Sequence, residues 1–228
     1  MSNGTVTIFD STIKDPITTI GKYAGICYGS GTSDPQKNYK RGLNCIKSGH
    51  GRVLEFCDVH MELAGWSARV MREFMRHTSD GLTALQASTR YIKEDNFKYF
   101  TPTTIWKDDD CIEVYKTTMD VIQQSYNYML ACGIPQEDAA NILPLGMETT
   151  VVIKKNARCL QNMAAVRLCN RTYSEYRMLM REMIKALKDY SEEWATLCDL
   201  IMVCKCDITK TCQEEKSCGK YEKVFDAE

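Results

Sequence analysis

Residues 52–77 read RVLEFCDVHMELAGWSARVMREFMRH, and the spacing of their apolar side chains changes partway along the segment. In the first half, side chains such as Val59 and Met61 alternate with polar residues, as in a strand that buries one face. In the second half, apolar residues recur every three or four positions, as on one face of a helix. We therefore predict a strand over 52–65 that leads directly into a helix over 66–77.

The rest of the chain mixes strand and helix patterns without the βαβ alternation of a parallel α/β protein. Strand patterns occur at 5–10 and 147–155, and helical patterns at 16–30, 35–51, 108–132, 135–143 and 156–203, the last with a break near 170–174. These patterns predict an α+β fold with a mixed or antiparallel sheet and long helices. We expect a single domain over residues 1–204 and an irregular, polar, cysteine-bearing tail over residues 205–228.

The composition is that of an ordinary globular protein, with 44% hydrophobic and 26% charged residues and a formal net charge of -1. This near-neutral balance gives no electrostatic reason to expect nucleic acid or an anionic membrane as a partner. The sequence has no long apolar run and no signal-peptide pattern at its start. Most of its 12 cysteines lie in apolar or helical contexts, so we expect reduced thiols and a cytoplasmic location.

A stretch rich in potential ligand-binding groups follows at residues 76–92, RHTSDGLTALQASTRYI. Hydroxyl groups, backbone amides and the fork-shaped guanidinium of Arg90 are suited to holding a phosphate. Arg76 and His77 have a simpler explanation as well, because basic residues at the end of a helix complement its dipole. This stretch by itself leaves both interpretations open.

Two further groups of polar residues stand elsewhere in the chain. Asn156, Arg158, Asn162 and Arg167 follow one another along a predicted helix, and apolar residues separate them. They either form a solvated face or enter a partly buried cleft, where each guanidinium would need an anionic or polar partner. His50, together with a glutamate five residues later, marks the start of the long strand, and both residues can equally be surface residues.

Taken together and in this order, these segments resemble the flavin-dependent thymidylate synthases. The family signature, Arg-His-Arg followed by Ser-x-Arg-Tyr, is matched by Arg76-His77-Thr78 and, after nine intervening residues, by Ser88-Thr89-Arg90-Tyr91. The family's upstream His and Glu match His50 and Glu55. Its downstream motifs match Glu137 to Pro144, then Asn156-Ala157-Arg158, and then a helix that carries Arg167. The resemblance covers roughly residues 1 to 204.

The resemblance implies an enzyme that methylates C5 of dUMP, with FAD, NADPH and methylenetetrahydrofolate, and that works as a homotetramer with sites between subunits. It places Arg167 at the uracil ring, where the cation would favour ionisation at N3. It implies flavin contacts from Arg52, Arg76, His77, Thr78, Gln86, Asn156, Ala157, Arg158 and Asn162. It implies nucleotide contacts from Glu73, Arg76, Gln86, Ala87, Ser88, Thr89, Arg90 and Arg167. No metal is implied.

The sequence departs from the family pattern at five positions. Thr78 stands for the third signature residue, and Ala140 replaces an arginine that contacts the nucleotide. Glu73 stands for a glutamine, Phe56 for a histidine, and Arg52 for a serine or threonine that faces the flavin. An unreplaced phosphate contact would cost roughly 1.5–3 kcal/mol, or one to two decades in nucleotide affinity.

These departures keep two other functions open: a sister flavoenzyme that acts on another pyrimidine nucleotide or one-carbon product, and a non-catalytic protein that binds flavin or nucleotide. A further question concerns the tail, where Cys204, Cys206, Cys212 and Cys218 lie close together in sequence. Their spacing lacks the paired C-x-x-C pattern of zinc ribbons. We therefore expect thiols or a disulfide there rather than a metal.

Overall fold

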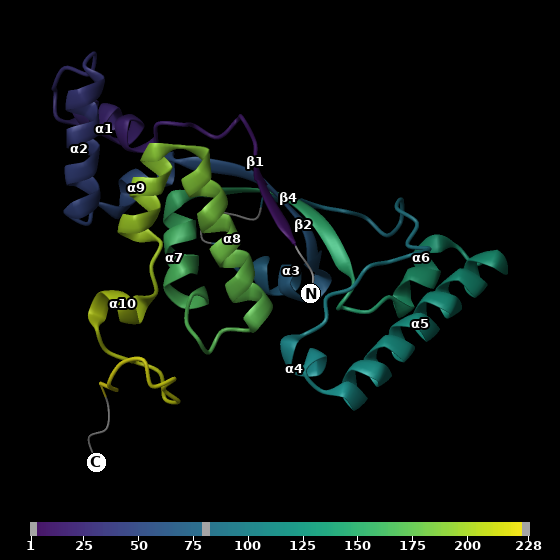
Figure 1. The fold of residues 1–228 in the computed structure, drawn as a ribbon. Coiled ribbons are helices and arrows are strands. Elements are labelled where there is room, and N and C mark those ends of the chain that lie inside the picture. The colour runs from purple at the N-terminus through teal and green to yellow at the C-terminus, as the bar shows by residue number, and fades with distance from the viewer. Residues whose placement is uncertain (1–3, 79–82, 225–228) are drawn as a thin grey trace. The chain divides into compact units, whose positions relative to one another are not determined.

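The computed structural model describes residues 4–78 and 83–224 (Figure 1). Its four strands are β1 (Thr5–Ile8), β2 (Asp58–Ser67), β3 (Thr83–Gln86) and β4 (Glu148–Asn156). They pair in the order β1-β2-β4-β3, so the two long strands, which are distant in sequence, are neighbours at the centre of the sheet. Together with ten α-helices along the described residues, this sheet confirms the predicted α+β class.

The described chain divides into two compact units, and β2 and β4 contribute residues to both. Unit 1 comprises Met1–Thr5, Glu62–Arg76 and Ala84–Ile153. Unit 2 comprises Val6–Met61, His77–Thr83 and Lys154–Glu228.

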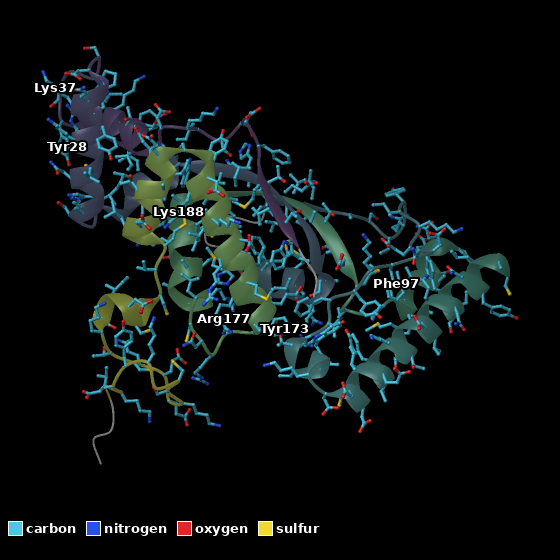
Figure 2. All side chains as sticks on the ribbon, in the orientation of Figure 1. Tyr28, Lys37, Phe97, Tyr173, Arg177 and Lys188 are labelled. Carbon is cyan, nitrogen blue, oxygen red and sulfur yellow. The ribbon has the colours of Figure 1, made fainter. Side chains whose placement is uncertain are left out.

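Unit 1 is built around a long helix, α5 (Asp109–Ala131). Asp108 caps its N-terminus by accepting a hydrogen bond from the amide of Cys111 at 2.9 Å, as the acidic run predicts. Unit 1 also holds the short helices α3 (Ala68–Phe74), α4 (Thr103–Trp106), α6 (Gln136–Ala139) and η2 (Ala140–Ile142). Phe97, which Figure 2 shows beside α5, forms a small apolar core with Met119 and Met147.

Unit 2 contains the remaining helices. They are α1 (Pro16–Cys27), α2 (Pro35–Lys47), η1 (Gly51–Phe56), α7 (Ala157–Arg167), α8 (Ser174–Tyr190), α9 (Glu192–Ile201) and α10 (Lys205–Thr209). Helices α7 and α9 both pack on α8, and the fully buried Trp194 and Leu197 belong to this core.

Helices α1 and α2 cross in close backbone contact through two glycines. A Cβ atom on Gly42 would lie 2.0 Å from the carbonyl oxygen of Ile17, and one on Gly21 would lie 1.7 Å from the carbonyl oxygen of Asn38. Only glycine allows the two backbones to approach this closely.

The structure corrects the predicted elements at several places. The predicted strand over 52–65 begins only at Asp58, because Gly51–Phe56 form a 3₁₀ helix that turns Leu54, rather than its neighbours, into the core. Strand β3 and helix α4 were not predicted, and neither was the break at Ser191 that separates α8 from α9. The tail is not irregular throughout, since it contains α10 and a β-bridge between Cys212 and Lys223.

Candidate functional site

The start of α7 carries the predicted Asn-Ala-Arg motif, and its first residue has a structural role. The side chain of Asn156 accepts a hydrogen bond from the amide of Cys159 at 2.8 Å and so caps the helix. Ala157 is fully buried, and its amide donates to the carbonyl of Cys57 at 2.8 Å. Asn162, one turn further on, is exposed.

The two arginines of α7 do not share a face, contrary to one interpretation of the sequence. Nine residues separate Arg158 from Arg167, which is two and a half turns of a helix. Arg158 donates to the side chain of Gln161 at 2.8 Å, whereas Arg167 makes its contacts with His77 and Tyr176. Each arginine therefore belongs to a different group of side chains.

Arg158 packs against Gly51, the residue that follows His50. Its guanidinium packs so closely on Gly51 that a Cβ atom there would lie 2.3 Å from the terminal nitrogen. His50, Gly51 and Arg52 line a mostly apolar hollow of about 450 Å³. Three aromatic residues complete the wall: Tyr23 of α1, Tyr28 just after α1, and Phe56 of η1. Such a hollow, apolar with a few polar groups at its rim, is typical of a site for a small molecule or cofactor.

Arg167 is held by an aromatic and hydrogen-bonded group in unit 2. Its Nε donates to Nε2 of His77 at 2.9 Å, so this histidine nitrogen is an acceptor and carries no proton. The guanidinium lies over the ring of Tyr176, 4.6 Å from its centroid. The His77 ring meets the same tyrosine edge-on, with centroids 6.1 Å apart. Underneath, the buried Lys155 donates from Nζ to the His77 carbonyl at 2.9 Å.

In unit 1, the Ser-Thr-Arg-Tyr segment forms a turn after β3. The amides of Tyr91 and Ile92 donate to the Ser88 carbonyl at 3.0 and 2.9 Å, and the amide of Arg90 donates to the Ser88 hydroxyl at 3.3 Å. Arg90 Nε donates to a carboxylate oxygen of Glu137 at 2.7 Å. The terminal nitrogens of Arg90 make no other hydrogen bond within the residues that the structure covers, and so are available to an anion.

Helix α6 fastens this turn. The side-chain nitrogen of Gln136 donates to the carbonyls of Thr89 and Ile92, at 2.6 and 2.8 Å. Half-buried Ala140, where the family has an arginine, follows directly at the end of α6. An arginine at position 140 would therefore lie directly after α6, the helix that already contacts the turn containing Arg90.

The other predicted nucleotide contacts of unit 1 are more exposed. Arg76 forms an ion pair with Glu73 at 3.5 Å, and the side chain of Arg76 is 73% exposed. Gln86 donates to the hydroxyl of Thr149 across the sheet at 3.5 Å. Ala87 follows Gln86 at the end of β3, and its amide donates to the carbonyl of Thr150 at 2.8 Å.

The signature is therefore divided between the units. His77 and exposed Thr78 fall in unit 2, whereas Arg76 and the segment from Gln86 to Arg90 fall in unit 1. The residues between them, 79–82, lie outside the described part of the chain. Most of the predicted flavin contacts thus gather in unit 2, and most of the predicted nucleotide contacts gather in unit 1.

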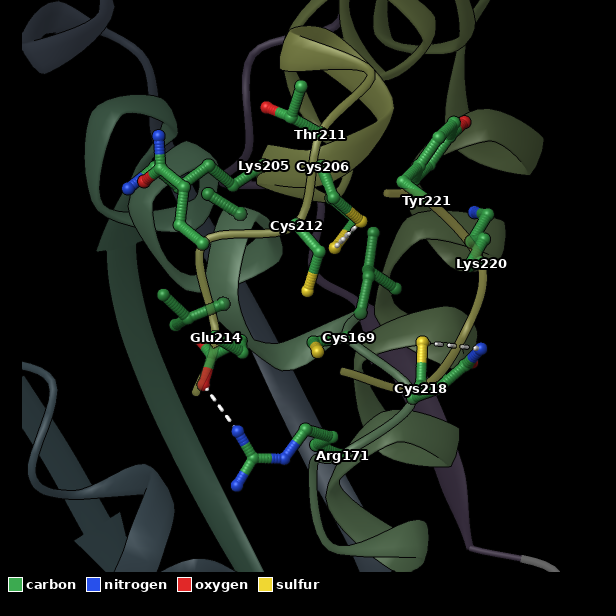
Figure 3. Close-up of a pocket in the computed structure, with 16 residues that line it drawn as sticks. Cys169, Arg171, Lys205, Cys206, Thr211, Cys212, Glu214, Cys218, Lys220 and Tyr221 are labelled. Atoms are coloured by element: carbon green, nitrogen blue, oxygen red, sulfur yellow. Dashed lines mark hydrogen bonds and ion pairs between the residues drawn. The ribbon is translucent and has the colours of Figure 1, made fainter. Parts of the chain in front are cut away.

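Five cysteines of unit 2 line a separate cavity of about 80 Å³ between α7, α10 and the tail: Cys169, Cys204, Cys206, Cys212 and Cys218 (Figure 3). All are free thiols, and the Sγ atoms of Cys204 and Cys206 are 3.4 Å apart. Burial and a hydrogen bond with Cys204 raise the pKa of Cys206 to about 11, so this thiol is protonated at neutral pH. Within residues 4–78 and 83–224, no three His, Cys, Asp or Glu side chains are arranged to hold a metal ion.

Two residues of the Arg167 group were missed from the sequence. Tyr176 gives no local signal, because its contact with Arg167 depends on how α7 and α8 pack. Lys155 does give one: it occupies a position in β4 where the alternation of Val151 and Ile153 calls for an apolar residue.

Comparison with known proteins identifies the family. The model of the family described as thymidylate synthase complementing protein matches residues 7–191. Similar proteins include the flavin-dependent thymidylate synthases of Geobacter sulfurreducens, 28% identical over 183 residues, and Sulfurisphaera tokodaii, 31% identical over 147 residues. These alignments cover 76% and 64% of this chain, and 78% and 56% of the two relatives.

A solved structure of the UMP/dUMP methylase PolB from Streptomyces cacaoi, bound with 5-Br dUMP, has the same fold. It superposes with a TM-score of 0.70 at 18% identity, over 87% of this chain and 96% of that one. None of the helices described here is long and apolar enough to cross a bilayer. Since the family model spans most of the sequence, the chain belongs to the thymidylate synthase complementing protein family, the family of the flavin-dependent thymidylate synthases.

Proposed function

We propose that the chain is a flavin-dependent thymidylate synthase that converts dUMP to dTMP. The one-carbon unit comes from methylenetetrahydrofolate, and bound FAD, once reduced by NADPH, supplies the hydride that completes the methyl group. The observation that carries this proposal is the family match over residues 7–191, within which the motif residues appear in the family's order.

The residues of unit 2 fit a flavin. The apolar hollow beside His50, Gly51 and Arg52 offers aromatic surface for a flat ring system, and Arg158 supplies a cation next to it. Thr78, Asn156, Ala157 and Asn162 complete the proposed flavin contacts, as do His77 from unit 2 and Arg76 and Gln86 from unit 1. A Cys nucleophile is not required, because the cofactor would deliver the hydride and the protein would orient the reactants and stabilise their charge.

The nucleotide is assigned to the Gln86–Arg90 segment and to Arg167. In this proposal the two terminal nitrogens of Arg90 bind the phosphate, with help from the backbone amides and hydroxyls of Ser88 and Thr89. Glu73, Arg76 and Ala87 are the remaining proposed contacts. Arg167 holds the uracil and stabilises the negative charge that develops on the ring during methylation.

The organisation of the whole protein follows the family expectation. We propose a cytoplasmic homotetramer with sites between subunits, no nucleic-acid or membrane partner, and no metal. We also propose that residues 1–204 form a single functional domain and that residues 205–228 form a polar, cysteine-containing C-terminal tail.

The test begins with the visible absorbance of the purified protein. After anaerobic reduction with NADPH, bound flavin is expected to reoxidise without oxygen only when dUMP and methylenetetrahydrofolate are both present, with formation of dTMP. A parallel reaction with UMP tests whether a different nucleotide is preferred. Protein that cannot be loaded with FAD, or that keeps its flavin reduced with both substrates, would contradict the proposal.

A further inference from the structure

A lysine in the core of unit 2 needs an explanation. Successive residues of β4 face opposite sides of the sheet, so Lys155 lies on the same side as Val151 and Ile153. These three residues are 1%, 0% and 2% exposed, whereas Lys154 faces the other side and pairs with Asp58 at 2.7 Å. A fully buried lysine is rare in proteins, and an apolar residue would meet the packing requirement of this position.

The ammonium group of Lys155 points to the candidate site. Nζ donates to the His77 carbonyl at 2.9 Å, and the ring of His77 in turn accepts from Arg167 Nε at 2.9 Å. The rings of His77 and Tyr176 meet edge-on, and the Arg167 guanidinium lies over Tyr176. A series of direct contacts therefore leads from the buried ammonium, through one histidine, to the arginine assigned to the uracil.

This arrangement determines which part of Arg167 is available. The guanidinium uses its inner nitrogen, Nε, for His77 and one face for Tyr176. The two outer nitrogens make no hydrogen bond with any described residue, and they form the edge that suits a uracil carbonyl and a deprotonated N3. The backbone of His77 accepts from Lys155, and its ring accepts from Arg167 Nε.

We propose that Lys155 is a positioning residue of the active site: it fixes the His77 backbone, so that the imidazole holds Arg167 with its outer edge toward the pyrimidine. The proposal rests on the proposed function, since it takes the ligand of Arg167 to be dUMP. It gives Lys155 a role that acts through Arg167 and that does not involve contact with the substrate.

The experiment compares two adjacent lysines. Lys155→Met keeps an unbranched side chain that is one atom shorter and removes the donor, and Lys154→Met makes the same change on the opposite side of the strand. Lys155→Gln is a second variant without the ammonium group, and its amide nitrogen lies one bond short of the position of the lysine Nζ. For each full-length protein we would measure the melting temperature, the Kd of FAD, the Kd of dUMP and kcat for dTMP formation.

For both Lys155 variants we expect dUMP binding to weaken and kcat to fall, each by roughly tenfold or more, because small displacements of an orienting group are costly in enzymes. FAD binding should weaken less than dUMP binding, because His77 is one of several proposed flavin contacts; we expect a loss of up to about threefold, or about half a decade of affinity. Lys154→Met should match the wild type. Lys155→Arg, which retains a cationic donor, should recover part of the loss.

A double-mutant cycle separates positioning from general stability. In an Arg167→Ala background, Lys155→Met should weaken dUMP binding no further, because its effect passes through that arginine. The inference would be overturned if Lys155→Met weakened dUMP binding equally in both backgrounds, or if it left dUMP binding and kcat unchanged. In either case, dTMP formation by the wild type would leave the proposed function intact. A wild type that forms no dTMP would overturn the proposed function, and the inference with it.

Discussion

Replacing Arg90 with alanine tests the proposed phosphate contact most directly. In the structure, Arg90 Nε is 2.7 Å from Glu137 Oε2, but the two side chains are 64% and 53% exposed. An ion pair this exposed contributes at most about 1 kcal/mol to folding. The variant should therefore fold normally, and its melting temperature should change little.

The effect on nucleotide binding should be much larger. Each hydrogen bond from a charged group contributes roughly 1.5–3 kcal/mol, which corresponds to a roughly 10- to 150-fold weaker Kd for dUMP. The Glu137 carboxylate, left without its cation, would add repulsion toward the phosphate. Isothermal titration with dUMP and with deoxyuridine separates the phosphate from the base, and only dUMP binding should weaken.

Lys93→Ala is the matched control for this experiment. Lys93 follows the same turn, pairs with Asp95 at 3.6 Å and is 58% exposed, so its removal changes the net charge equally. Its dUMP affinity should stay within about twofold of the wild type, since screened surface charges contribute little. Equal losses for dUMP and deoxyuridine in Arg90→Ala, or equal losses in both variants, would refute the assignment of Arg90 to the phosphate.

Three further perturbations have defined outcomes. Arg167→Ala should abolish dTMP formation while the flavin absorbance of the bound cofactor persists; full turnover would remove this arginine from the mechanism. Gly42→Ala should cost about 1–3 kcal/mol in urea unfolding because its Cβ would overlap the backbone of α1, whereas Gly31→Ala, with no atom within 4 Å of its Cβ, should change little. Burial raises the pKa values of Cys57 and Cys198 from 9.0 to about 12. As pH rises, these thiols ionise first in the unfolded chain, so their burial does not lower the free energy of unfolding below pH 9. Between pH 9 and 12 the free energy of unfolding should fall by about 1.4 kcal/mol per pH unit for each thiol. Urea unfolding of a double Cys→Ala variant should show a shallower fall, and an equally steep one would contradict this.

The sequence was most informative where local chemistry decides structure. The capped helix at Asp108, the helices that start at Pro16 and Pro35, and strand β4 were all predicted close to their observed bounds. The family was also predicted correctly, because its motifs are defined by residue type and order. The 3₁₀ helix at Gly51–Phe56 was missed, since alternation over so few residues does not show that Leu54 is the buried one.

The site was harder to predict because its contacts are made between elements. The arginines of α7 share one sequence segment, but helical geometry directs them to different partners. The contact of Gln136 with the turn near Arg90 depends on an approach between segments more than 40 residues apart. Lys155 was visible as an anomaly in the β4 alternation, but only the structure shows that it reaches His77.

Helix α5 also provides a molecular ruler. Cys111 in its first turn and Cys132 just beyond its last are both exposed thiols, 21 residues apart. At 1.5 Å per residue, spin labels on the two would be attached about 32 Å apart along a straight helix. The Asp108 carboxylate raises the pKa of Cys111, so this thiol should react with maleimide more slowly than an ordinary surface cysteine. With the other exposed cysteines, Cys27 and Cys218, changed to serine, spin labels would attach to Cys111 and Cys132. Dipolar spectroscopy would then show whether this helix stays straight with and without ligand.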